Sequence, residues 1–181
     1  MSSLDGGSIY DAIAGFLREQ RLLFHEEPES ARVRFEYASP TGAWTTWVVA
    51  FEEARQVAVY GVVPVPADPP QLPALAELVT RINFGLVVGN FELDYDGGEI
   101  RCKTSLDIED TALPADAFAA LLRQLLRANL ALMEHHLPAF VAAVLHSRPP
   151  AEALALLDRE PAPAGGNLAE ALSGLRDAAN P

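Results

Sequence analysis

The chain has 181 residues, a formal net charge of −12 and only thirteen basic residues, among which Lys103 is the single lysine. Nucleic-acid binding depends on Lys and Arg neutralising phosphates, so this charge balance argues against a nucleic-acid partner. Half of the residues are apolar, which is enough for one domain with a substantial core.

The distribution of apolar residues also argues against a membrane partner. No uninterrupted apolar run approaches the ~20 residues of a membrane span, and the first fifteen residues lack the basic and apolar segments of a secretory signal. Cys102 is the single cysteine and has no internal partner for a disulfide. We therefore expect a cytoplasmic protein.

A helix followed by a three-stranded antiparallel meander is predicted for the first third of the chain. Residues 8–24 have helical apolar spacing, with Ser8 as the predicted N-cap. Period-two alternation then predicts strands in "ARVRFEYAS", "AWTTWVVAFE" and "QVAVYGVV". The predicted inward residues are Val33, Phe35, Tyr37, Trp47, Val49, Phe51, Val57, Val59 and Val63.

The opposite face of this meander is unusually apolar. It is predicted to carry Trp44, Val48, Tyr60 and Val62 beside Arg32 and Arg34. A sheet with helices on one side normally exposes polar groups on the other. We therefore interpret these four residues as a candidate partner or dimer surface, covered by another subunit, by the C-terminal tail or by another protein; the alternative is a loop of the same domain.

The middle of the chain predicts a proline-rich crossover, a second helix and a hairpin. Residues 63–73 are too rich in proline for a helix or a central strand. Residues 72–88 resume helical spacing, and Gly89 is predicted to end that helix. In "GNFELDYDGGEIRCKTSLDI" a turn at Asp96-Gly97 opposes Glu92 to Arg101, with the inward set Phe91, Leu93, Tyr95, Ile100, Cys102 and Leu106.

The carboxylates of this hairpin do not follow the spacing of a known ion loop. An EF-hand loop that starts at Asp94 would need a ligand at its fifth position and Glu at its twelfth, where the chain has Gly98 and Ser105. A P-loop would need Gly-Lys-Ser/Thr entering a helix. We expect no metal site and no cofactor here.

The last third predicts one long helix and a separate tail. Residues 114–146 carry a wide apolar stripe, and Pro138 is expected to kink or split the helix. Residues 147–181 are rich in Ala, Pro and Gly, which sets the predicted domain at 1–146 and the tail at 147–181. Two short amphipathic pieces in the tail are too short to be stable alone, and their candidate docking residues are Leu154, Leu157, Leu168, Leu172 and Leu175.

Few residues are arranged for catalysis. Adjacent His135 and His136 point about 100° apart on a helix and lack an HExxH pattern. Cys102 lies on an inward strand position, which favours a buried hydrophobe over a nucleophile. Asn83 and Asn129 interrupt apolar stripes and are expected to fix a contact or a register through hydrogen bonds.

The element order and the segment "INFGLVVGNFELDYDGGEIRCKTSLDI" resemble the YbjN-like family of small bacterial proteins, described as sensory transduction regulators, over about residues 8–146. The resemblance implies an α+β, type III secretion chaperone-like fold with the order helix, three strands, helix, two strands, helix. Its antiparallel sheet would carry helices mainly on one face. The short helical C-terminal tail predicted from the sequence lies outside the resemblance or decorates it. It also implies a dimer that acts by binding protein partners.

We therefore expect a non-enzymatic, homodimeric, protein-binding adaptor or chaperone-like regulator with an unidentified protein client. The alternative is a metal-dependent or small-molecule enzyme that uses the acidic hairpin and the His135/His136 pair. A third hypothesis is autoinhibition, in which the tail helices 152–158 and 168–176 cover the apolar sheet face until a partner displaces them.

Overall fold

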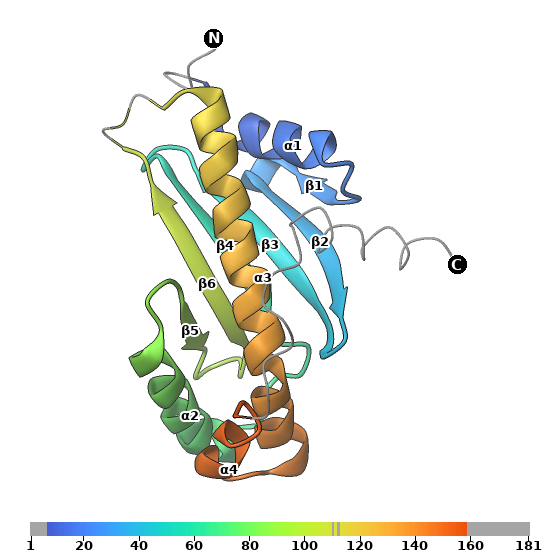
Figure 1. Ribbon diagram of the computed structural model, residues 1–181, viewed down its shortest axis with the longest axis vertical. Coiled ribbons are helices and arrows are strands. Elements are labelled where there is room, and N and C mark those ends of the chain that lie inside the picture. Colours follow the sequence, from blue (N-terminus) through green and yellow to red (C-terminus); the bar gives the residue numbers. More distant parts are fainter. Residues whose placement is uncertain (1–6, 110, 112, 159–181) are drawn as a thin grey trace.

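The computed structural model describes residues 7–109, 111 and 113–158, which form a six-stranded antiparallel sheet with helices mainly on one of its faces (Figure 1). The strand order is β1-β2-β3-β4-β6-β5. The predicted α+β class and element order are present, with one short additional strand, β1, that the sequence analysis did not predict. The elements are α1 (Ile9–Glu19), β1 (His25–Glu27), η1 (Pro28–Ser30), β2 (Arg32–Ser39), β3 (Gly42–Phe51), β4 (Gln56–Val62), η2 (Pro69–Gln71), α2 (Leu72–Gly85), β5 (Asn90–Leu93), β6 (Ile100–Asp107), α3 (Ala115–His146) and α4 (Pro150–Leu154).

Helix α1 is held at its N-terminus by a carboxylate from the turn between β3 and β4. Ser8 is the N-cap, as predicted, and its hydroxyl accepts from the Asp11 backbone N–H at 3.1 Å. The Glu52 carboxylate accepts from the backbone N–H groups of Ile9 at 2.9 Å and Tyr10 at 2.7 Å. These free N–H groups and the helix dipole both favour a negative charge there, so Glu52 joins α1 to the sheet.

Replacing Glu52 with glutamine is expected to lower the free energy of unfolding by about 1 kcal/mol at pH 7. Burial alone would raise the pKa of Glu52, but the hydrogen bonds from Tyr10, Ile9 and Ser8 outweigh burial and hold its pKa below the usual 4.5. A lowered folded-state pKa contributes stability above the unfolded-state value, and this contribution is lost as the pH falls through the folded-state value. Urea denaturation of both proteins should therefore show a gap at pH 7 that closes below about pH 4.5; a gap that does not change with pH would contradict this role.

The faces of β3 are the reverse of the prediction, so the assignment of Trp44 and Val48 to an outer surface is wrong. Both side chains are 1% exposed and belong to the core. Trp44 pairs with Tyr37 on β2, and Val48 pairs with Val33. Directly opposed residues of an antiparallel pair share a face, so the inward residues of β2 place Trp44 and Val48 inward as well.

Consequently Trp47, Val49 and Phe51, which were predicted to point inward, lie on the opposite face. Trp47 pairs with Tyr60 of β4, so these two residues share that face. The predictions for β2 and β4 are confirmed, since their inward residues are all buried: Val33, Phe35, Tyr37, Val57, Val59 and Val63.

Helix α3 crosses the inner face of β4 and β6 and is fixed there by Asn129. Its side-chain N–H group donates to the backbone carbonyls of Val59 and Cys102, both at 3.0 Å. The close approach depends on Gly61, because a Cβ there would lie 2.5 Å from Met133 Cγ and 2.8 Å from Asn129 Oδ1. The expectation that Asn129 fixes a contact is confirmed.

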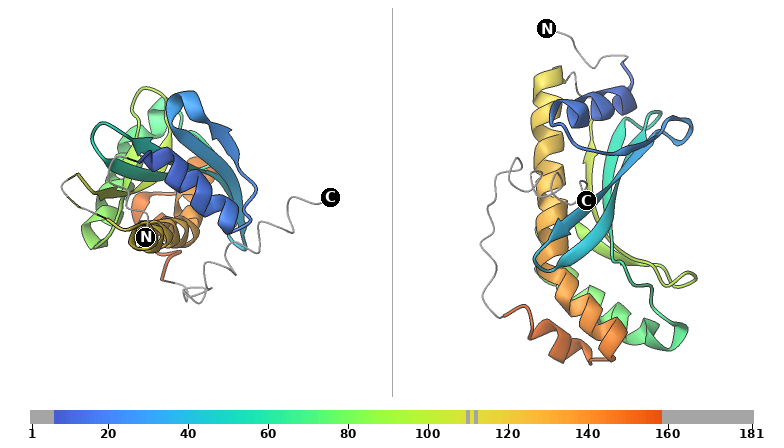
Figure 2. Two further views of the ribbon diagram at one scale, coloured as in Figure 1. Left: turned by 90° about the horizontal axis from the view of Figure 1, so that it is seen from above. Right: turned by 90° about the vertical axis from the view of Figure 1, so that its right-hand side faces the viewer.

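Helix α3 runs through Pro138 without a break and changes direction in its C-terminal part (Figure 2, right). Pro138 therefore does not split the helix. By length and composition α3 could cross a membrane, but 56% of its most apolar window is buried within the protein. That burial explains the apolar stripe as packing of a core helix.

The β5–β6 hairpin has the predicted register but a different turn. Phe91 pairs with Cys102 and Glu92 with Arg101, as predicted. The Asp94 carboxylate accepts from the backbone N–H groups of Asp96 and Gly97, and the Asp94 carbonyl accepts from the Gly98 N–H at 2.9 Å. The loop is thus wider than a two-residue turn at Asp96-Gly97.

This wider loop has two consequences. It turns Tyr95 out to solvent, so the inward prediction for Tyr95 is wrong. It also needs a glycine at position 98, where φ is +71° and a Cβ would lie 2.1 Å from the carbonyl oxygen of Ala67.

The start of the predicted tail packs on the domain. Helix α4 lies against α2 and α3 at the lower end of the molecule (Figure 1). Ala153 is buried, and Leu154 and Leu157 pack partly buried against the core. The other candidate docking residues of the tail, Leu168, Leu172 and Leu175, lie outside the described residues.

Candidate functional site

The face of the sheet opposite α1 and α3 carries an apolar centre, and no described segment forms a helical layer over it (Figure 2, right). We call this surface the open sheet face. One row of side chains crosses four strands on it, because Arg34 pairs with Trp47, Trp47 with Tyr60, and Tyr60 with Lys103. The neighbouring row holds Glu36, Thr45, Val62, Arg101 and Glu92. With Val49, these rows define the open sheet face.

Arginine side chains lie over both aromatic rings of the open sheet face. The Arg32 guanidinium is 4.6 Å from the centre of the Trp47 ring, and that of Arg34 is 5.7 Å from it. The Arg101 guanidinium is 4.5 Å from the centre of the Tyr60 ring. Such contacts orient the rings and leave them half-buried.

The charges around this apolar centre are paired. Glu92 accepts from Arg101 at 2.8 Å and also binds Lys103. Arg32 donates to Glu27 at 2.6 Å. Burial alone would raise the pKa of Glu92, but the hydrogen bonds and charges of Lys103 and Arg101 outweigh burial and lower it. The open sheet face is therefore close to electrically neutral, although the chain carries −12.

The edge of the sheet at β5 is closed by the side chain of Asn83. The Asn83 amide donates to the Phe91 carbonyl at 2.9 Å and accepts from the Phe91 N–H at 2.8 Å. These are the two hydrogen bonds that a neighbouring strand would otherwise form. Asn83 thus has the structural role that was expected, and it protects an edge that would otherwise invite pairing with another chain.

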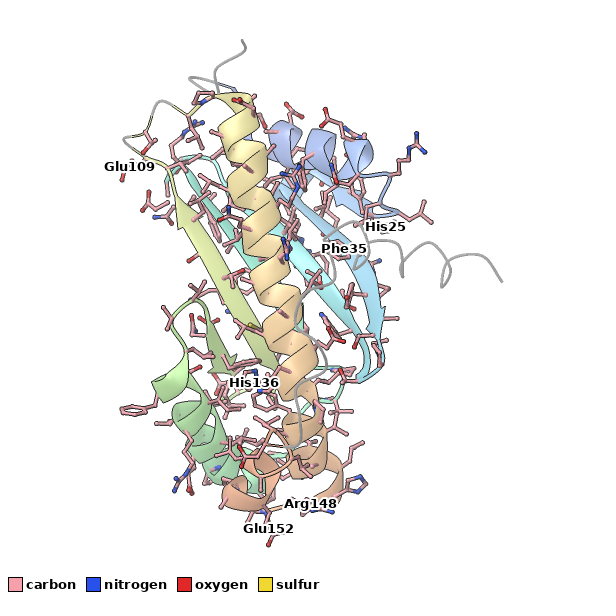
Figure 3. All side chains as sticks on the ribbon, viewed as in Figure 1. His25, Phe35, Glu109, His136, Arg148 and Glu152 are labelled. Atoms are coloured by element: carbon pink, nitrogen blue, oxygen red, sulfur yellow. The ribbon has the colours of Figure 1, made fainter. Side chains whose placement is uncertain are left out.

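The rings of the two adjacent histidines lie 4.6 Å apart between centres, but one ring is buried and the other is exposed. His136 is buried where α3 passes α2 and β5 (Figure 3), and its ring lies edge-on to Phe91, with the ring centres 5.1 Å apart. Its Nδ1 lies 2.8 Å from the Leu132 carbonyl, which fits a donated N–H. Burial lowers the pKa of His136 to about 4, so the ring is neutral. His135 is exposed.

The remaining candidate reactive groups are held in structural contacts. Burial raises the pKa of Cys102 to about 12, which disfavours the thiolate. The hairpin carboxylates of Glu92 and Asp94 are occupied by cation pairs and by the turn. Within residues 7–109, 111 and 113–158, no group of three or more His, Cys, Asp or Glu could hold a metal ion.

Of the predicted partner-surface residues, the structure places Tyr60 and Val62 on the open sheet face and removes Trp44 and Val48 from it. The central residue of the face, Trp47, was missed as a surface residue. A signal for it exists in the sequence. If Pro40-Thr41 is a two-residue turn, Tyr37 opposes Trp44 and Arg34 opposes Trp47, as the structure has them.

One family profile matches most of the chain. The family profile described as "YbjN: Putative bacterial sensory transduction regulator" matches residues 10–137. The crystal structure of YbjN from E. coli, described as "a putative transcription regulator", has 14% sequence identity, covers 70% of this chain and 89% of its own, and has a TM-score of 0.50. This likeness shows the fold and confirms the predicted α+β class.

A chain from the crystal structure of the ExsC–ExsE complex has 15% identity, a TM-score of 0.37, and covers 67% of this chain and 87% of its own. None of the curated proteins compared with the chain matches it.

Proposed function

Because the chain belongs to the YbjN family, we propose that it is a non-enzymatic adaptor or chaperone-like regulator that acts by binding other protein chains, starting with a second copy of itself. The open sheet face carries this proposal. Its composition is that of an interaction surface, with Trp and Tyr at the centre, arginines over the rings and paired charges at the rim.

The charge distribution supports a second copy of the chain as one partner that binds the open sheet face. Two chains of charge −12 repel each other over most of their surface. On the open sheet face, however, Glu36 and Glu92 offset all but one of the charges of Arg34, Arg101 and Lys103. The adjacent Arg32 is paired with Glu27, so this surface is nearly neutral. A neutral, apolar surface is where two copies of an acidic protein can meet with the least repulsion.

We further propose that the protein acts in the cytoplasm without a cofactor, and that its other partner is a protein client. The low number of basic residues and the net charge of −12 support a protein over a nucleic acid or a membrane surface. A single, buried cysteine suits a reducing compartment.

Replacing Trp47 with alanine is expected to weaken self-association at least ten-fold, because a central aromatic side chain of an interface typically contributes ~2 kcal/mol or more and ten-fold corresponds to ~1.4 kcal/mol. Sedimentation velocity of the full chain at tens of micromolar should show a dimer for the wild type and a monomer for Trp47→Ala.

The matched control is Leu23→Ala, which removes an apolar side chain that is 68% exposed between α1 and β1, outside the open sheet face. It should leave the dimer unchanged. A wild-type monomer, or equal association by wild type and Trp47→Ala, would refute the proposed dimer.

A further inference from the structure

The last turn of α2 and the turn that follows it expose large apolar side chains that are separate from the open sheet face. Phe84 is 95% exposed and Val87 is 98% exposed, and Val88 is also exposed. We call these three residues the apolar turn. Single exposed apolar residues are ordinary, but three within five positions form a patch that normally has a partner.

The described chain ends close to the helix that carries the apolar turn. Helix α4 packs against α2, and Leu157, at the end of the described chain, is partly buried against the core. Helix α2 has 14 residues, so its whole length is about 21 Å. Any segment that continues from Asp158 therefore starts within about the length of α2 from Phe84, which lies at the end of that helix.

The sequence beyond Asp158 contains a segment of matching size. Leu168, Leu172 and Leu175 stand at the i, i+4 and i+7 positions of a helical stripe. A helix this short is unstable without a partner. Residues 159–167 can span up to ~30 Å when extended, which exceeds the length of α2, so the stripe can reach the apolar turn.

The small size of the apolar turn favours a tethered occupant over a separate protein. A stable complex of separate chains buries roughly 800 Å² on each partner, and three side chains on one turn supply much less. A second copy would also bring a charge of −12 to this site, where the nearby Arg81 is already paired with Glu77. A segment on a short linker has an effective concentration of about millimolar, so even a weak contact keeps it bound.

We propose that the C-terminal segment 168–175 of the same chain docks on the apolar turn, with its leucines against Phe84, Val87 and Val88. The docked segment shields this patch from solvent. This docking site lies outside the open sheet face and does not depend on the proposed dimer.

Cysteine cross-linking in the full-length chain tests the docking. The double variant Val87→Cys/Leu172→Cys should form an intramolecular disulfide under mild oxidation at low micromolar concentration, at least ten-fold faster than Leu23→Cys/Leu172→Cys. Leu23 is exposed. The segment between α1 and β1 that carries it lies at the other end of the molecule from α2 (Figure 1). Cys102 does not interfere, because it is buried and its pKa is about 12.

A second measurement uses an apolar fluorescent dye. Leu172→Glu should raise dye binding several-fold by uncovering the apolar turn, and the increase should be absent when Phe84→Ser and Val87→Ser are added. Equal cross-linking rates for the two cysteine pairs would overturn the proposal. Disulfide-linked dimers as the main product would assign the apolar turn to a second copy and would overturn it as well.

Discussion

Replacing Trp44 with alanine is expected to lower the free energy of unfolding by about 3–5 kcal/mol, the usual range for truncating a fully buried large aromatic residue. Trp44 is 1% exposed, and its ring lies 4.8 Å from that of Tyr37 between centres. Replacing Trp47 on the same strand with alanine should lower the free energy of unfolding by about 1 kcal/mol or less, because the Trp47 ring is half-buried under Arg32. Chemical denaturation with a common m-value would measure both effects.

The conservative variant Trp44→Phe separates loss of volume from loss of hydrogen bonding. The Trp44 Nε1–H is buried and has no hydrogen-bond partner among the described residues. Phenylalanine keeps most of the apolar contact and removes the unpaired donor, so Trp44→Phe should recover much of the stability that Trp44→Ala loses. A tolerated Trp44→Ala combined with a severely destabilised Trp47→Ala would restore the face assignment of the sequence analysis and contradict the structure.

The error on β3 has a clear physical origin. This strand has large apolar residues at both even and odd positions, with Trp44 and Val48 on one face and Trp47 and Val49 on the other. Alternation alone therefore cannot choose the inward face, and a shift of one residue exchanges the faces completely. Strand β2 was predicted correctly because Arg32, Arg34 and Glu36 mark its polar face.

The β5–β6 hairpin shows which features the alternation of apolar residues predicts and which it does not. Alternating residues of β5 and β6 predict the pairs Phe91–Cys102 and Glu92–Arg101, which the structure has. The position of Tyr95 depends on the Asp94 carboxylate and on the approach of Gly98 to Ala67, a contact between segments far apart in the sequence. Local pattern carries no information about such a contact.

Only part of the open sheet face could be predicted from the sequence. Tyr60 and Val62 follow from the alternation of β4, but Trp47 requires the register of two hairpins. The apolar turn was missed because helical spacing continues past Gly85, where α2 ends. The sequence pattern therefore places Phe84, Val87 and Val88 in a continuation of the helix.

Replacing Asn129 with leucine is expected to lower the free energy of unfolding by about 2–5 kcal/mol, since each buried carbonyl that loses its partner costs ~1–3 kcal/mol. Asn129 is fully buried and donates to Val59 and Cys102, carbonyls of two adjacent strands. Leucine has a similar volume, so the loss reports the hydrogen bonds that fix α3 on the sheet. Thermal and chemical denaturation should agree on its size.

Aspartate at this position gives a pH-dependent test of the same contact. Asn129→Asp removes the donor and places a carboxylate against two carbonyl oxygens in the core, so burial would raise its folded-state pKa above the usual ~3.9. The folded state then binds more protons than the unfolded state, and stability falls as the pH rises. We expect Asn129→Asp to lose more stability relative to wild type at pH 7 than at pH 4, whereas the loss for Asn129→Leu should be equal at both; equal losses for Asn129→Asp would show that residue 129 is open to solvent and does not hold α3 on the sheet.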